Sequence, residues 1–198
     1  VPREAPADWQ KRTFGTADDP AGDCEFVPDP AQRELVIRVP DARRTWPDRP
    51  STAPRTARRV RGDFAVEVAV AYTPLPYPPA LKGEKNGRHV GSFGGGLWLG
   101  DDAGDVRLTF VREHEPGVRP AGTWFWANHV QTHFNAPGVG SSHGSSGFDA
   151  GDRTARFGLR LVRAGDAVAT SYRRPGRGWE SFGSHKGRLP AELSVGVV

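Results

Sequence analysis

The chain contains 198 residues, of which 36% are hydrophobic and 25% are charged. This length suits one large β-sandwich or at most two small domains. The 25 Gly and 18 Pro leave little room for long helices. The formal net charge is +4, but the basic residues are spread along the whole chain and interleaved with acidic ones, which argues against a nucleic-acid partner.

Cysteine and methionine usage set further limits. Cys24 is the single Cys, so no intrachain disulfide can form, and we expect it to be a small buried hydrophobe. No apolar run approaches the length of a membrane span, and no signal-peptide pattern is present. Because the chain has no Met, we expect that it follows a removed segment or was excised from a longer protein. The compartment stays open, with an extracellular or cell-envelope location favoured over the cytoplasm.

Alternation of bulky and small residues predicts strands in the first half of the chain. A short apolar run at 35–39 is the first. In 63–72 every second residue from Phe64 onward is bulky, which is typical of a strand with one face turned inward. The prolines of 74–79 exclude a strand interior there. In 105–113, Val106, Leu108 and Phe110 share one face, which turns Arg107 to the other.

The second half continues this pattern. We expect 123–135 to be a strand followed by a loop, and the Gly/Ser-rich segment 138–151 to be a flexible loop. Strands follow at 154–163 and 167–173, joined by a tight hairpin at Gly165-Asp166, and residues 193–197 alternate to the end of the chain. Repeated strands with turns and no intervening helices predict an antiparallel sandwich or barrel.

Several short motifs together resemble a known superfamily. They are Gly22-Asp23-Cys24, Gly62-Asp63-Phe64, Gly95-Gly96-Leu97-Trp98-Leu99, Leu159-Arg160-Leu161-Val162-Arg163 and Gly178-Trp179. The chain resembles the concanavalin A-like lectin/glucanase superfamily, in particular a bacterial branch of regulation-of-enolase-like domains of unknown function. The resemblance implies a single all-β domain over 1–198, a two-sheet antiparallel jelly-roll with little helix. It implies no particular ligand, because one fold hosts many functions.

The chain departs from this superfamily at its C-terminal end. Relatives continue beyond a strand like the one ending at Val198 and add one more strand that returns to the core. We therefore expect either that the closing C-terminal strand is missing, or that another segment or a partner supplies it. The resulting open edge is a candidate surface for a protein partner or for self-assembly.

The sequence gives only a weak signal for catalytic residues. Glucanase-like relatives use two carboxylates on one strand face, about 5 Å apart in retaining enzymes. Neither Glu-x-Asp-x-x-Glu nor Glu-x-Asp-x-Glu occurs. The nearest substitute is Glu113 with Glu115, but Pro116-Gly117 follows, so we interpret the pair as a charged strand end. The sequence assigns no catalytic residue, and a non-enzyme is favoured.

Two groups resemble metal sites. The acidic turn of Asp101, Asp102 and Asp105 offers oxygen ligands for calcium, although Asp and Gly are also ordinary turn residues. His129 and His133 are four residues apart, but no third ligand is evident and the segment is not helical. No metal and no cofactor are assigned, with calcium kept as the alternative at the acidic turn.

Aromatic side chains provide the remaining signal. Trp98 is out of phase with Leu97 and Leu99, so it is predicted to face outward, and Trp124 and Trp126 share a face. Flat aromatic platforms and planar polar groups are what sugar binding requires. The predicted ligand-binding residues, on the outer face of one curved sheet, are Trp98, Arg107, Trp124, Trp126, His129 and Asn135.

The sequence therefore favours a non-catalytic, lectin-like module that binds a carbohydrate or similar surface polymer. Two alternatives stay open. One is a structural or interaction module of a larger cell-envelope or other assembly. The other is a glycoside hydrolase or lyase with an atypical site.

Overall fold

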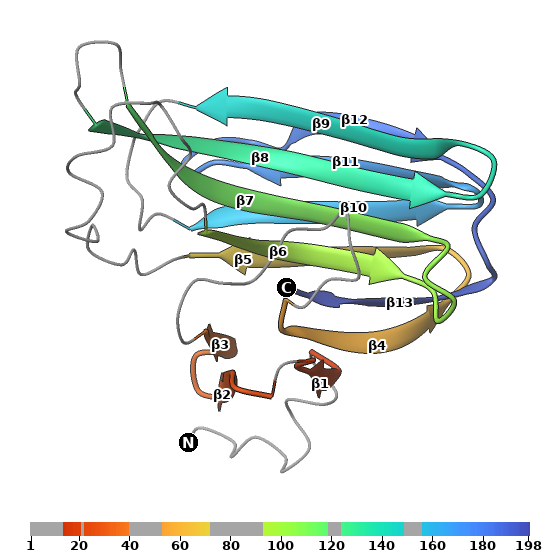
Figure 1. Cartoon of the computed structure of the whole chain (residues 1–198), viewed down its shortest axis with the longest axis horizontal. Helices are drawn as coiled ribbons and strands as arrows, with labels where there is room; N and C mark the ends of the chain where they lie inside the picture. The colour runs from red at the N-terminus through yellow and green to blue at the C-terminus, as the bar shows by residue number, and fades with distance from the viewer. Residues whose placement is uncertain (1–13, 21, 40–52, 72–92, 119–123, 149–155) are drawn as a thin grey trace.

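The computed structural model describes residues 14–20, 22–39, 53–71, 93–118, 124–148 and 156–198, and within them the side chains of 93, 113–129 and 146–148 are not described. This part of the chain contains β-strands and turns and no helix. The strands form two facing antiparallel sheets and a separate hairpin (Figure 1). The predicted all-β, two-sheet sandwich of the jelly-roll class is confirmed.

The larger sheet has seven strands in the order β1-β4-β13-β6-β7-β8-β9. Their bounds are β1 (Thr16–Asp18), β4 (Arg55–Arg61), β13 (Glu192–Val197), β6 (Phe93–Gly100), β7 (Arg107–Val118), β8 (Trp124–Ala136) and β9 (Gly140–Phe148). The strand that ends the chain, β13, pairs with β4 on one side and β6 on the other. It is an interior strand, so the prediction of an open edge at the C-terminal strand is wrong.

The smaller sheet has four strands in the order β12-β11-β10-β5, and the hairpin pairs β2 with β3. The bounds are β5 (Phe64–Val70), β10 (Phe157–Ala164), β11 (Ala167–Arg173), β12 (Glu180–Lys186), β2 (Glu25–Asp29) and β3 (Glu34–Arg38). The predicted Gly165-Asp166 turn is confirmed, because Ala164 pairs with Ala167 across it and Gly165 has a φ of 56°.

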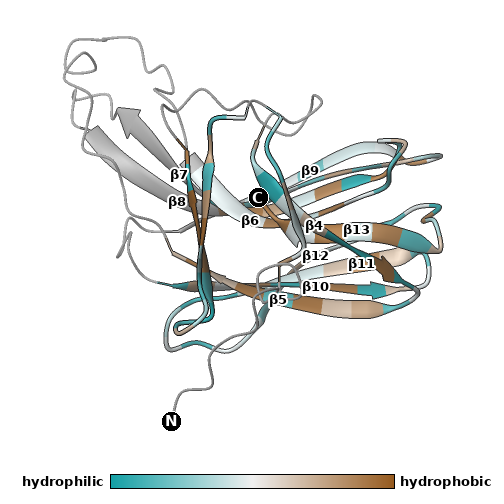
Figure 2. Ribbon diagram, turned by 90° about the horizontal axis from the view of Figure 1, so that it is seen from below, coloured by the Kyte–Doolittle hydropathy of each residue, from teal (hydrophilic) through white to brown (hydrophobic). Residues whose placement is uncertain are grey.

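The core lies between the two sheets, where the alternation of the sequence places it. Val106, Leu108 and Phe110 are at most 2% exposed, as predicted, and Leu159 and Leu161 are fully buried on the facing sheet. The even-numbered residues of β5 pack against this cluster. Hydrophobic residues recur along the strands of both sheets in Figure 2. Burial of such side chains contributes about 1.5–3 kcal/mol each, which fixes the face that these strands turn inward.

Three local predictions are wrong, and each underestimates strand length. Residues 140–148 form β9 rather than a flexible loop, because they pair with β8 from Asn128 to Ala136. β8 is one strand up to Ala136, so 123–135 does not turn into a loop. β7 passes through Pro116 to Val118, so the strand does not end at Glu115. Pairing with a neighbouring strand offsets the poor strand propensity of Gly, Ser and Pro here.

In the described part of the chain, no helix has the length and apolar character needed to cross a membrane.

Candidate functional site

The two sheets leave a groove where their free edges meet. β9 is the last strand of the larger sheet and β12 is the last strand of the smaller one. They run side by side along one side of the sandwich (Figure 1). The groove between them has a volume of about 450 Å³. This is within the range of about 300–1,000 Å³ that is usual for small-molecule sites.

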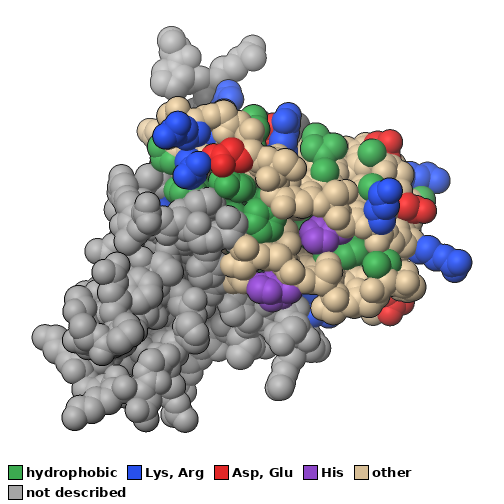
Figure 3. All heavy atoms as spheres, turned by 90° about the horizontal axis from the view of Figure 1, so that it is seen from above, with side chains coloured by type: hydrophobic (Ala, Val, Ile, Leu, Met, Phe, Trp, Pro, Cys, Tyr) green, Lys and Arg blue, Asp and Glu red, His purple; other side chains and the backbone are tan. Residues whose placement is uncertain are grey.

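The groove is lined by hydroxyl groups, aromatic rings and imidazoles. None of the described lining residues is Asp, Glu, Lys or Arg. Figure 3 views this side of the molecule, where histidine side chains lie near the centre and charged side chains lie toward the periphery. The lining residues are Thr132, Ser142, His143, Gly144, Ser145, Tyr172, Ser181, Phe182, Gly183, Ser184 and His185.

Among the described residues, a hydrogen bond between β9 and β12 crosses the groove. Ser142 Oγ on β9 lies 3.2 Å from His185 Nδ1 on β12. The His185 ring also packs on Phe134, with 5.0 Å between ring centroids. Burial lowers the pKa of His185. Its Nε2 is buried and has no hydrogen-bond partner among the described residues. A nucleophilic Ser–His pair needs a third group that orients the base, so this contact assigns no catalytic role.

A fixed tyrosine forms the end of the groove. The Tyr172 hydroxyl donates a hydrogen bond of 2.9 Å to Glu180 Oε2. Arg174 holds the other carboxylate oxygen through Nε at 3.0 Å and a second nitrogen at 2.8 Å. The hydrogen bonds from Arg174 and Tyr172 lower the pKa of Glu180, whereas burial and then Glu180 raise the pKa of Tyr172. The ring of Tyr172 is thereby held beside that of Phe182, at 6.2 Å between centroids.

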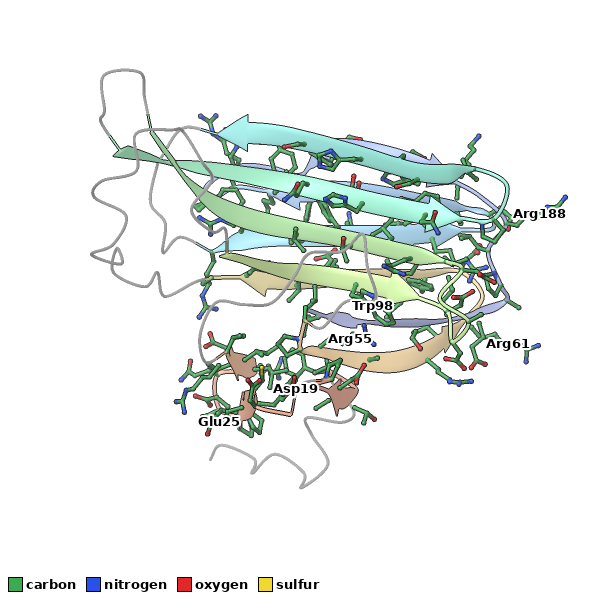
Figure 4. All side chains as sticks on the ribbon, in the orientation of Figure 1. Asp19, Glu25, Arg55, Arg61, Trp98 and Arg188 are labelled. Atoms are coloured by element: carbon green, nitrogen blue, oxygen red, sulfur yellow. The ribbon has the colours of Figure 1, made fainter. Side chains whose placement is uncertain are left out.

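Trp98 lies on the face of the larger sheet opposite to Leu97 and Leu99, which belong to the core. Its side chain is only 9% exposed. The guanidinium of Arg55 on β4 lies 4.9 Å from the centre of the ring, and Arg55 pairs with Asp18 at 2.6 Å. Figure 4 shows Arg55 and Trp98 beside each other between β4 and β6. Little of the indole is left open to a ligand.

The other predicted site residues are dispersed. Arg107 is partly buried, and Asn135 pairs with it in register and donates a hydrogen bond of 3.1 Å to the carbonyl of Asp105. The side chains of Trp124, Trp126 and His129 lie outside the described residues. The structure therefore describes three of the six predicted side chains, Trp98 included, and Trp98 and Asn135 contact other parts of the chain.

Two carboxylates of the acidic turn at 101–105 contact other parts of the chain. The Asp101 carboxylate accepts a hydrogen bond of 3.1 Å from the amide of Val106, and Asp102 pairs with Arg59. The pairing of β6 with β7 on both sides makes this segment the predicted hairpin. Asp101, Asp102 and Asp105 do not come together as a metal-ligand group.

Among the described residues, one group brings acidic and thiol ligand atoms within 4.8 Å of one another, namely Asp19, Asp23 and Cys24. Asp19 accepts a hydrogen bond from the Cys24 amide at 2.7 Å, which closes a turn before β2. Cys24 is half-buried, and burial followed by the charge of Asp19 raises the pKa of its thiol. His133 stacks on His143, at 4.3 Å between centroids, and forms no such group.

The groove residues were missed in the sequence. Residues 180–186 hold a single bulky apolar residue, Phe182, and 140–148 hold seven Gly and Ser, so neither segment shows a clear strand pattern. The available signal was the Ser-x-His-x-x-Ser spacing of 141–146. In a strand, this spacing places Ser141 and His143 on one face and Ser146 on the other.

The fold and this edge groove define the molecule as a two-sheet β-sandwich with a polar, aromatic groove at one edge. No protein-family model matches the sequence, and a search of curated proteins finds no match. Among solved structures, a functionally unknown protein from Saccharomyces cerevisiae is similar, with a TM-score of 0.51 and 11% identity over 74% of this chain. This chain covers 64% of that protein's length, and the likeness supports the fold alone.

Proposed function

We propose that the protein is a non-catalytic, lectin-like module of the concanavalin A-like kind and that it binds an uncharged glycan in the groove between β9 and β12. The observation that carries this proposal is the lining of the groove. It combines hydroxyls and imidazoles with two aromatic rings and contains no charged side chain among the described residues.

This lining matches the chemistry of a neutral sugar chain. Sugar hydroxyls both donate and accept hydrogen bonds, and serine, threonine and imidazole groups do the same. The apolar face of a pyranose ring packs on an aromatic ring, and the partly buried Phe182 supplies one. Tyr172 is 7% exposed and belongs to the core, so it supports Phe182 from the side. Phe182 is anchored from below by Phe110, at 5.4 Å between ring centroids.

The lining also favours binding over hydrolysis. Glycoside hydrolysis requires a general acid and a second carboxylate flanking the scissile bond. Glu180 is the carboxylate next to the groove, and Tyr172 and Arg174 occupy its oxygens. Its lowered pKa keeps it ionised, which suits a positioning group and not a proton donor.

The test is a screen of soluble neutral polysaccharides, for example galactomannan, xyloglucan and mixed-linkage β-glucan, by affinity electrophoresis and product analysis. We expect retention without release of products. The variant Phe182→Leu keeps an apolar contact with Phe110 but removes the ring, so it should raise the Kd about 5- to 10-fold, equivalent to about 1–1.4 kcal/mol.

The matched control is Phe26→Leu, the same substitution in the separate β2–β3 hairpin. It should leave binding unchanged. Release of sugar products would support a hydrolase or lyase instead. Absence of retention together with concentration-dependent assembly would support a structural module.

A further inference from the structure

A second feature lies on the outer face of the smaller sheet, away from the groove. Gly158 and Arg160 of β10 and Arg173 of β11 alternate with core residues, so all three point outward. Trp179 lies across them. A Cβ at Gly158 would be 3.1 Å from the indole, so the glycine leaves the space that the ring occupies.

Two guanidinium groups flank the indole. Arg160 lies 5.3 Å and Arg173 lies 4.9 Å from the centre of the Trp179 ring. Contacts of this kind contribute about 0.5–1 kcal/mol each at exposed positions. They hold both charged groups beside a partly exposed aromatic surface. We call Trp179, Arg160 and Arg173 the Trp179 cluster.

The cluster carries uncompensated positive charge. Arg160 pairs with Glu67 on β5 at 2.8 Å, which balances one charge. Arg173 is exposed and no carboxylate contacts it among the described residues, and Arg177, two residues before Trp179, is also exposed. A planar guanidinium presents several N–H donors in a geometry that matches carboxylate and sulfate oxygens.

We propose that the Trp179 cluster is a second binding site, and that it takes the acidic sugar units of an anionic polysaccharide. The pyranose ring packs on Trp179, and its carboxylate or sulfate group accepts hydrogen bonds from Arg173. Charge complementarity supports this occupant, and so does the combination of an aromatic ring with a guanidinium group that no carboxylate contacts in the described part of the chain. The site is independent of the groove, because its residues lie on the opposite face of β10 and β11.

The experiment measures binding by affinity electrophoresis and calorimetry with four probes: polygalacturonate, dextran sulfate, neutral dextran and a DNA duplex. We expect binding of an anionic polymer and none of dextran, and the better of the two polymers identifies the anion as carboxylate or sulfate. Arg173→Gln should weaken this binding about 5- to 10-fold.

The control is Arg188→Gln, which removes the same charge from an exposed position at the far end of the molecule (Figure 4). It should leave binding nearly unchanged. A second variant, Trp179→Phe, should weaken binding with little loss of Tm.

Equal losses in Arg173→Gln and Arg188→Gln would overturn the proposal, because they would show attraction to net charge alone. Binding of a DNA duplex as tight as that of either acidic polymer would also overturn it, as would absence of binding to both polymers. Phe182→Leu should not affect anionic-polymer binding, so failure of this site and failure of the groove are distinguished.

Discussion

Both tryptophan side chains that the structure describes, Trp98 and Trp179, form cation–π contacts with arginine. The two differ in exposure: Trp98 is covered, whereas Trp179 is partly open. Arg112 shows the same preference in the core, where its guanidinium lies 4.0 Å from the centre of the Phe157 ring although the residue is fully buried. Residue type alone could not separate these environments.

Burial changes the expectation for Trp98. The sequence predicted an outward-facing Trp98 that is available to a ligand, but a Trp that is 9% exposed is well packed. We expect Trp98→Ala to cost about 3–5 kcal/mol, which lowers Tm by roughly 6–20 °C in a domain of this size. Differential scanning calorimetry measures the change. Trp98→Phe keeps a ring under Arg55 and should lose less than half as much. An unchanged Tm in the alanine variant would contradict this packing.

The elements show which sequence signals were sufficient. β5, β10, β11 and β13 were predicted because bulky residues alternate with small or charged ones, and burial of one face follows directly from that pattern. β9 and β12 were missed because they are edge strands in which every residue except one Phe is Gly, Ser, His or charged. β4 was missed because Arg58, Arg59 and Arg61 interrupt the alternation of apolar and polar residues, so the inward position of Thr56 and Val60 is not evident from the sequence. Such strands form because they hydrogen-bond to a neighbouring strand, and the sequence of one strand does not indicate which strand that neighbour is.

The position of β13 depends on the close approach of Gly196 to the backbone of Thr56 on β4. A Cβ at Gly196 would lie 1.6 Å from the Thr56 carbonyl oxygen of β4, so backbone would have to move. Gly196→Ala should therefore destabilise the larger sheet severely, by about 3 kcal/mol or more, since overpacking against backbone is poorly relieved. Urea unfolding checks this. Gly178→Ala is the control, because nothing lies within 4 Å of its Cβ, and it should shift the midpoint little. Equal midpoints in both variants would contradict the close contact.

At the scale of the whole molecule, the candidate site is a product of the arrangement of the two sheets. Ser142 and His185 are 43 residues apart in the chain and belong to different sheets. The sequence indicated the sandwich, the inward faces and the absence of an acidic catalytic signature. It did not indicate that the edges of β9 and β12 lie together, because strand order within a sheet follows from long-range pairing and not from local pattern. The predicted outer-face site consequently differs from the groove.

The link between the sheets should depend on pH. Burial lowers the pKa of His185 in the folded state below its ordinary value of 6.5, so the unfolded chain binds more protons between those two values. The stabilising contribution of neutral His185 is complete above about pH 6.5, declines as the pH falls below it, and is fully lost below the folded-state pKa.

Protonation would also leave a charged imidazole against Phe134, with a buried Nε2–H that has no acceptor among the described residues. We expect the urea midpoint of the wild type to fall between about pH 7.5 and about pH 5, and to fall less in His185→Gln, whose amide retains a hydrogen-bonding group beside Ser142 without titrating. Parallel pH profiles in the wild type and His185→Gln would contradict the assignment, because the acid sensitivity would then come from other groups.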